Sequence, residues 1–252
     1  MCELFGASAN RKVRVDPFLK VLMAHSVDHP HGWGMALFYP GGVNVEKEPK
    51  TAWASDYVRT RLAHPILARN IIAHIRLATR GNMVYENCHP FVNRDHTGRA
   101  WTLAHNGTIF QSELLDQYRT VQEGATDSER ILCHIIHEMN RAGETDPEQR
   151  FQIMDRIVLD IVEHNKVNLM VFDGETLYVH TNMRGTLYRS ERDGAVLFAT
   201  VPLDDGVWEP VPMMRLFAYR DGKLTAEGTQ HACEYFKPDP DPASLLNQCA
   251  GL

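Results

Sequence analysis

The first residue of this chain that could act as a nucleophile is Cys2, which follows Met1 directly. Met1 is usually removed before a residue as small as cysteine, and its removal would leave the sulfur of Cys2 close to its own α-amino group. One residue would then supply a nucleophile and a base. An α-amine titrates at about pH 8 and a free thiol at about pH 8.5, so roughly a tenth of each is reactive at neutral pH. A lone cysteine is more often a small buried apolar residue, so the assignment needs partners elsewhere in the chain.

Two polar side chains lie near the end of an apolar segment. Residues 70–79 are mostly apolar, which predicts a strand covered on both faces. Arg76 and Thr79 are three residues apart, where the strand is expected to end. An arginine alone is more often part of a surface ion pair, and a threonine alone is an ordinary strand residue. From these two residues alone, a functional role and a purely structural role both stay open.

Asn106 and Gly107 follow a second short strand, which is predicted over residues 101–105. Asn-Gly most commonly forms the two-residue turn of a hairpin. No alternating strand follows within a few residues, however, because residues 112–118 have a helical pattern. The sequence is compatible with a hairpin turn and with another use of this pair.

Asp127 lies at the expected start of a helix. Thr126 to Glu129 have capping-box spacing, which explains a threonine or aspartate here without any function. Apolar residues then recur with helical period over residues 129–143, so this helix is expected to face the core.

No metal or other cofactor is expected. The loop 25–34 contains three histidines, but no helix or strand holds them at ligand spacing. The helix 129–143 contains a second group, in which adjacent side chains point about 100° apart. The two groups are His25, His29 and His31, and Cys133, His134, His137 and Glu138.

The remaining patterns predict one α+β domain over residues 2–252. Helices are expected after Asp16 and Asp146, where proline stands in the first turn. From residue 166 onward, short apolar segments alternate with three Asp-Gly pairs, which predicts an antiparallel meander. The Pro-rich segment 237–244 is expected to cross the surface without regular structure. Other expected elements are strands over residues 2–9, 35–39 and 43–47 and a helix over 55–62.

Composition argues against several classes of protein. Lys+Arg number 26 and Asp+Glu 32, so the net charge is −6, and neither nucleic acid nor a membrane is expected as a partner. No apolar run approaches the roughly 20 residues that cross a bilayer. The N-terminus lacks a signal segment. Five cysteines without CxxC spacing argue against a disulfide framework, so a cytoplasmic protein is expected.

Five segments, in order, resemble the class II glutamine amidotransferases, a family with an N-terminal nucleophile. The chain is most similar to short stand-alone members of the YafJ-like type. The resemblance implies a four-layer αββα sandwich of the N-terminal-nucleophile hydrolase type, with two mostly antiparallel sheets. The segments are CELFG at residues 2–6, HIRLATRG at 74–81, ENCHPF at 86–91, AHNG at 104–107 and TDSE at 126–129.

The resemblance implies catalytic roles for three residues. Cys2 would attack the side-chain amide carbon of glutamine and form a γ-glutamyl thioester, with release of ammonia. The side-chain amide of Asn106 and the backbone N–H of Gly107 would hold the oxyanion.

Three further residues would bind the substrate. Arg76 would grip the α-carboxylate in a two-pronged geometry that lysine cannot reproduce. Thr79 would add a hydroxyl to the same carboxylate, and Asp127 would take the α-ammonium group. His31 stands where many members have an arginine, which leaves the contacts of that loop with glutamine open. His89 is expected to make a structural hydrogen bond.

The leading hypothesis is an enzyme that cleaves glutamine as a glutaminase or as an ammonia source for an unknown acceptor, with a possible acceptor or synthase protein as partner. The alternative is a γ-glutamyl amide hydrolase, which performs the same half-reaction on a larger γ-glutamyl conjugate. A non-catalytic binding protein is a third hypothesis, which the presence of all five segments disfavours. In each enzyme hypothesis, activity depends on removal of Met1.

Overall fold

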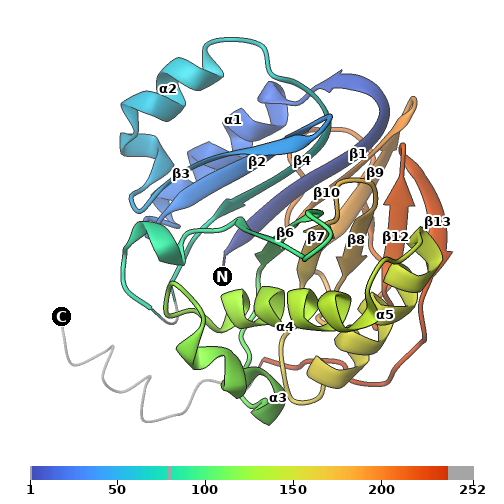
Figure 1. Cartoon of the computed structure of the whole chain (residues 1–252). Helices are drawn as coiled ribbons and strands as arrows, with labels where there is room; N and C mark the ends of the chain where they lie inside the picture. The colour runs from blue at the N-terminus through green and yellow to red at the C-terminus, as the bar shows by residue number, and fades with distance from the viewer. Residues whose placement is uncertain (1, 79–80, 238–252) are drawn as a thin grey trace.

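The computed structural model describes residues 2–78 and 81–237, whose strands form two sheets (Figure 1). One sheet contains β1 (Glu3–Arg14), β2 (Trp33–Tyr39), β3 (Gly42–Glu48), β4 (Leu67–Ile75), β9 (Tyr188–Arg192), β10 (Ala195–Ala199) and β11 (Glu209–Pro210). The other contains β5 (Phe91–Arg94), β6 (Ala100–His105), β7 (Leu169–Phe172), β8 (Leu177–His180), β12 (Phe217–Arg220) and β13 (Lys223–Glu227). Their orders are β11-β9-β10-β1-β4-β2-β3 and β13-β12-β8-β7-β6-β5. Every pairing between these described strands is antiparallel.

Helices cover the outer faces of both sheets. The helices α1 (Asp16–Ala24) and α2 (Asp56–Leu62) pack on the seven-stranded sheet. On the six-stranded sheet lie α4 (Asp127–Ala142) and α5 (Pro147–Ile161), with the short α3 (Glu113–Asp116) beside α4. Three apolar clusters fill the two helix–sheet interfaces and the space between the sheets. The predicted four-layer αββα sandwich is confirmed, since each sheet buries both of its faces.

Local sequence explains where the helices begin. Pro17 stands in the first turn of α1. At α5, Asp146 and Gln149 form a reciprocal capping box. At α4, the hydroxyl of Thr126 accepts a hydrogen bond from the backbone N–H of Glu129 at 3.2 Å. Thr126 is therefore the N-cap, and the interpretation of Asp127 as a cap is wrong.

Two strand boundaries differ from the prediction. β4 ends at Ile75, not at residue 79, although the backbone of Arg76 still pairs with the loop residues His31 and Gly32. β1 extends past residue 9 to Arg14, since its last residues pair with the start of β4 after a register shift. The strand β5 was not predicted. Arg76 consequently follows its strand, at the point where the chain turns.

The predicted antiparallel meander after residue 166 is divided between the two sheets. The three Asp-Gly turns do join hairpins, between β7 and β8, β9 and β10, and β12 and β13. The middle hairpin, however, joins the seven-stranded sheet, while the other two belong to the six-stranded sheet. Apolar residues of all three hairpins contribute to the cluster between the sheets, so the chain crosses between layers where local pattern predicted continuity.

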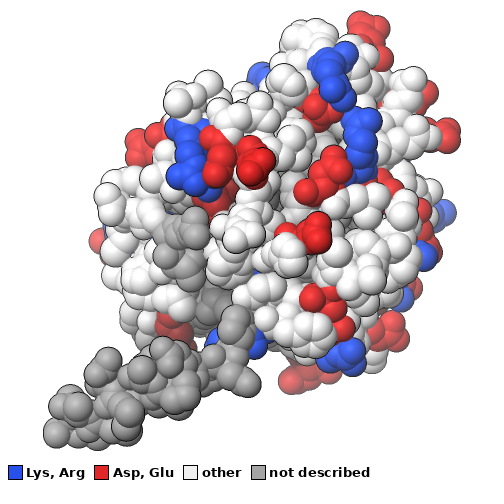
Figure 2. All heavy atoms as spheres, turned by 90° about the horizontal axis from the view of Figure 1, so that it is seen from below, with Lys and Arg blue, Asp and Glu red and all other residues white. Residues whose placement is uncertain are grey.

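The surface carries charges of both signs. On the face in Figure 2, Lys and Arg side chains lie among Asp and Glu side chains. Within residues 2–78 and 81–237, no helix is long and apolar enough to cross a bilayer. Most of the Pro-rich segment 237–244 lies outside the described residues.

Candidate active site

The predicted site residues that the structure describes lie where β1 begins and where β4 and β6 end. Glu3 of β1 pairs with Ile75 of β4, which places Cys2 beside the residues that follow β4. β6 ends at His105 in the facing sheet. A cavity of about 20 Å³, room for about one water molecule, lies at this junction. It is lined by Cys2, Arg76, Leu77, Ala78, His89, His105, Gly107, Thr126, Asp127 and Ser128.

Cys2 is held by the backbone of one residue. Its Sγ accepts a hydrogen bond from the N–H of Leu77 at 3.3 Å and donates to the carbonyl of Leu77 at 3.4 Å. Burial raises the pKa of the Cys2 thiol, and the hydrogen bond from the backbone N–H of Leu77 opposes that shift. In the described part of the chain, no histidine or carboxylate hydrogen-bonds to this sulfur. A thiol in this setting needs a base of its own to react at neutral pH.

Arg76 is 3% exposed, and its guanidinium is enclosed by backbone carbonyls. It donates to the carbonyls of Gly81 at 3.2 Å and Asn82 at 3.1 Å. These contacts aim the guanidinium at the loop that follows β4. Thr79, the predicted second ligand of the substrate carboxylate, lies outside the described residues.

Asn106 and Gly107 do not form a hairpin turn. The N–H of Asn106 donates to the carbonyl of Asn168 at 2.8 Å, and that of Thr108 donates to the carbonyl of Lys166 at 3.0 Å. The chain after β6 thus pairs with a segment about 60 residues later. A Cβ on Gly107 would lie 2.0 Å from the carbonyl oxygen of Lys166 and 2.1 Å from Nε2 of His105, so only glycine fits here.

The side chain of Asn106 presents an unused donor. Asn106 is 2% exposed and is not among the residues that line the cavity, although both of its neighbours are. Its Oδ1 accepts a hydrogen bond from Nζ of Lys166 at 3.4 Å. Its Nδ2 has no hydrogen-bond partner among the described residues. A buried donor without a partner costs about 1–3 kcal/mol, and a bound acceptor would recover that free energy.

Asp127 is the first residue of α4 and is 6% exposed. Its Oδ2 accepts a hydrogen bond from the N–H of Ile109 at 2.6 Å. This bond fixes the carboxylate against the segment that follows Gly107. The carboxylate therefore lies across the same small cavity as Cys2 and Arg76.

Two histidines to which the sequence assigned no catalytic role lie at or next to this cavity. Nδ1 of His31 accepts a hydrogen bond from the N–H of Ala78 at 2.8 Å, so this residue supports the backbone next to Leu77. His89 was expected to make a structural hydrogen bond, and this prediction is wrong. Both of its ring nitrogens lack partners in the described residues. Its ring instead packs against His74 and Phe91, with ring centroids 4.2 and 4.5 Å away.

The loop histidines of the first predicted group, other than His31, contact a carboxylate. His25 and His29 approach the two carboxylate oxygens of Glu3 at 2.8 and 3.9 Å. Across the described residues, no group of three or more His, Cys, Asp or Glu side chains could hold a metal ion.

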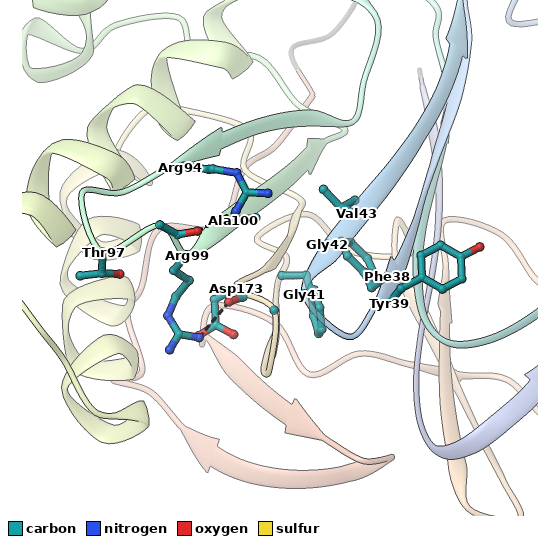
Figure 3. Close-up of a pocket in the computed structure, with 13 residues that line it drawn as sticks. Phe38, Tyr39, Gly41, Gly42, Val43, Arg94, Thr97, Arg99, Ala100 and Asp173 are labelled. Carbon is teal, nitrogen blue, oxygen red and sulfur yellow. Dashed lines mark hydrogen bonds between the residues drawn. The ribbon is translucent and has the colours of Figure 1, made fainter.

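Two larger cavities open at the other end of the sandwich. One of about 330 Å³ lies between the β2–β3 turn, the β5–β6 turn and the β7–β8 turn (Figure 3). A neighbouring cavity of about 720 Å³ shares its Phe38 and Phe172 and includes Leu67 at the start of β4. Because Leu67 pairs with Arg14 and Ile75 pairs with Glu3, these cavities lie a strand's length from Cys2. They are separate from the candidate site.

Comparison with known sequences decides the family. The sequence profile of a family described as class-II glutamine amidotransferases matches residues 1–191. The chain belongs to this family. YafJ of Escherichia coli is 30% identical over 191 residues, which are 73% of this chain and 74% of YafJ. An uncharacterised protein of Methanocaldococcus jannaschii is 31% identical over 255 residues, which cover 89% of this chain and 70% of that protein.

Solved structures support the fold of this class II glutamine amidotransferase. A Pseudomonas aeruginosa structure described as a predicted glutamine amidotransferase has a TM-score of 0.63 at 22% identity, with 89% of this chain and 100% of that chain covered. The glutamine phosphoribosylpyrophosphate amidotransferase of Bacillus subtilis has a TM-score of 0.67 at 18% identity, with 89% of this chain but only 48% of that chain covered. These likenesses show the two-sheet architecture with outer helices.

Sequence patterns did not single out every residue of the candidate site. His105 is 1% exposed, and its ring nitrogens lie 3.0 Å from Oγ of Ser128 and 3.0 Å from the carbonyl oxygen of Lys166. Burial lowers the pKa of His105. Both His105 and Ser128 stood within segments that resemble the family. Lys166 carried no such signal, because a lysine at the start of a strand is usually exposed.

Proposed function

We propose that this protein cleaves the side-chain amide of glutamine through Cys2. The observation that carries the proposal is the buried Nδ2 of Asn106, which has no hydrogen-bond partner among the described residues and lies next to a cavity that Cys2 lines. A donor of this kind, fixed before the substrate arrives, is suited to an oxyanion that exists only during the reaction. The backbone N–H of Gly107 would be the second donor.

The reaction begins with the amine of Cys2, once Met1 has been removed. The thiol gives its proton to this amine, and the sulfur attacks the amide carbon of glutamine. As the C–N bond breaks, the amine returns the proton to the leaving nitrogen, which departs as ammonia. Water or an acceptor then resolves the γ-glutamyl thioester, and with water the product is glutamate.

Opposite charges would hold the two ends of the amino acid. Arg76 would bind the α-carboxylate, with the hydroxyl of Thr79 beside it, and Asp127 would bind the α-ammonium group. A cavity of about 20 Å³ cannot contain glutamine. Substrate entry therefore requires the lining to move, and the carboxylate would replace some of the carbonyl contacts of Arg76 at Gly81 and Asn82.

The nitrogen would leave as free ammonia or pass to an acceptor, and we propose an acceptor or synthase protein as the partner that receives it. A γ-glutamyl amide hydrolase would use the same residues and differ only around the leaving amine. Comparing ammonia release from glutamine with turnover of γ-glutamyl amines separates these two functions.

A glutamine-analogue diazo-ketone tests the nucleophile. We expect one adduct on Cys2 by mass spectrometry of protein that lacks Met1, and no adduct in Cys2→Ala. The buried Cys88, which is not in the cavity, is the internal control and should stay unmodified. Absence of labelling in correctly processed protein would remove both enzyme hypotheses and favour a non-catalytic binding protein.

Arg76→Lys is expected to weaken substrate binding more than it slows the chemistry. Losing one of two charged hydrogen bonds costs about 1.5–3 kcal/mol, which corresponds to a rise in KM of about 10- to 100-fold, with kcat within about 3-fold. Steady-state ammonia release measures both constants. Equal losses in kcat and kcat/KM would contradict the assignment of Arg76 to the substrate carboxylate.

A further inference from the structure

Lys166 is a buried lysine whose backbone and side chain both contact the Asn106–Gly107 segment. It lies between α5 and β7 and is 6% exposed. Its backbone forms a bridge with Thr108, with N–O distances of 3.0 and 3.1 Å. Its carbonyl oxygen packs against the α-carbon side of Gly107, where a Cβ would clash. Its Nζ donates to Oδ1 of Asn106.

The contact with Nζ determines how the amide of Asn106 is oriented. An ammonium group has three donors and no acceptor. The ammonium can therefore form a hydrogen bond only with the oxygen of the amide. The NH₂ group of Asn106 must then point away from Lys166. Without the ammonium, the two orientations of the amide would differ little in energy, and one of them would present an oxygen where the oxyanion needs a donor.

The same ammonium lies close enough to Cys2 for their charges to interact. The positive charge of Lys166 lowers the pKa of Cys2, against the larger opposite effect of burial. Burial lowers the pKa of Lys166 to about 8, while Cys2 acts to raise it and Lys237 to lower it further. Lys166 also acts to lower the pKa of His105, which Asp127 acts to raise. A buried cation of this kind is costly to fold and is typical of functional sites.

We propose that Lys166, in its ammonium form, is a positioning residue that holds the amide of Asn106 with its NH₂ group toward the oxyanion and adds positive charge behind Cys2. This role rests on the proposed glutamine cleavage by Cys2. It assigns a function to a residue outside the five family-like segments, and it predicts that cleavage requires a protonated lysine.

The test compares Lys166→Met with Lys166→Arg in the processed full chain. We expect Lys166→Met to lower kcat about 100-fold, as loss of one oxyanion donor does, with KM within about 3-fold. Lys47→Met is the matched control, since burial also lowers the pKa of Lys47, but its Nζ donates to the carbonyl of Cys88 and neither residue lines the cavity. Its kcat should stay within about 2-fold.

The pH profile separates positioning from a merely structural role. In the wild type, kcat/KM should fall as pH rises through about 8, where Lys166 loses its proton. Lys166→Arg should retain part of the activity and lose this alkaline limb, because a guanidinium stays charged. If Lys166→Met does not fold, the profile of Lys166→Arg decides alone, and a limb that remains at about pH 8 overturns the proposal.

Thermal unfolding adds a second measurement, in which Lys166→Met should not lower the Tm although it lowers kcat. The pKa of Lys166 is lower in the folded chain than the usual 10.5, so its charge opposes folding below about pH 8, and this cost disappears as pH rises from about 8 to 10.5. Lys166→Met should therefore have a Tm at pH 7 no lower than that of the wild type, even though kcat falls. A kcat of Lys166→Met within 3-fold of the wild-type value would overturn the proposal about Lys166. Labelling of Cys2 by the diazo-ketone would still support the proposed function.

Discussion

A chain that keeps a residue before Cys2 is expected to turn over glutamine about 10²- to 10⁴-fold more slowly, the range that a positioned proton-transfer group contributes. The thiol of Cys2 is buried, its pKa is raised, and its hydrogen bonds within the described part of the chain run to the backbone of Leu77. Since no described histidine or carboxylate hydrogen-bonds to it, its own α-amine is the base at hand. Acylating that amine in a peptide bond removes the base and leaves the thiol.

The experiment inserts one glutamate between Met1 and Cys2, which makes Cys2 an internal residue. The matched control is a cleavable N-terminal fusion that, after cutting, leaves Cys2 as the first residue and should recover full activity. Intact mass confirms each N-terminus, and ammonia release gives kcat. An inserted chain with kcat within about 3-fold of the control would show that another group activates the thiol.

Asn106→Ala is expected to lower kcat about 10²- to 10³-fold and to change KM by less than about 3-fold. Removing a donor that acts only on the oxyanion slows the chemical step without weakening ground-state binding. The loss should be larger than for any substitution at the substrate-binding residues, because Nδ2 of Asn106 has no structural partner among the described residues. Steady-state kinetics of ammonia release measure both constants.

Asn106→Asp is the matched variant for this experiment. It keeps the size of the side chain and can still accept a hydrogen bond from Lys166, but it replaces the NH₂ group with an acceptor. We expect it to lose at least as much activity as Asn106→Ala while staying folded. If Asn106→Asp kept more than about a tenth of the wild-type kcat, Asn106 would not be the oxyanion donor.

The sequence by itself determined the local structure and the family. Proline and capping residues mark the starts of α1 and α5, and Asp-Gly pairs mark three hairpins, because these signals act over a few neighbouring residues. The five family-like segments indicated the four-layer architecture and named Cys2, Arg76, Thr79, Asn106, Gly107 and Asp127 as one site. The structure gathers four of these around one cavity and buries Asn106 beside it.

Only the tertiary structure decided what depends on contacts between distant segments. The β9–β10 hairpin joins the other sheet because its apolar residues fill the space between the layers, and hairpin turns carry no information about that choice. In sequence, Asn106-Gly107 is compatible with a hairpin turn. In the structure, this segment pairs with Lys166, which lies about 60 residues later in the chain. A lysine is expected to be exposed, and Lys166 is buried because distant segments of the chain pack around it. The positive charge that we propose behind Cys2 therefore depends on tertiary contacts, which no local sequence pattern predicts.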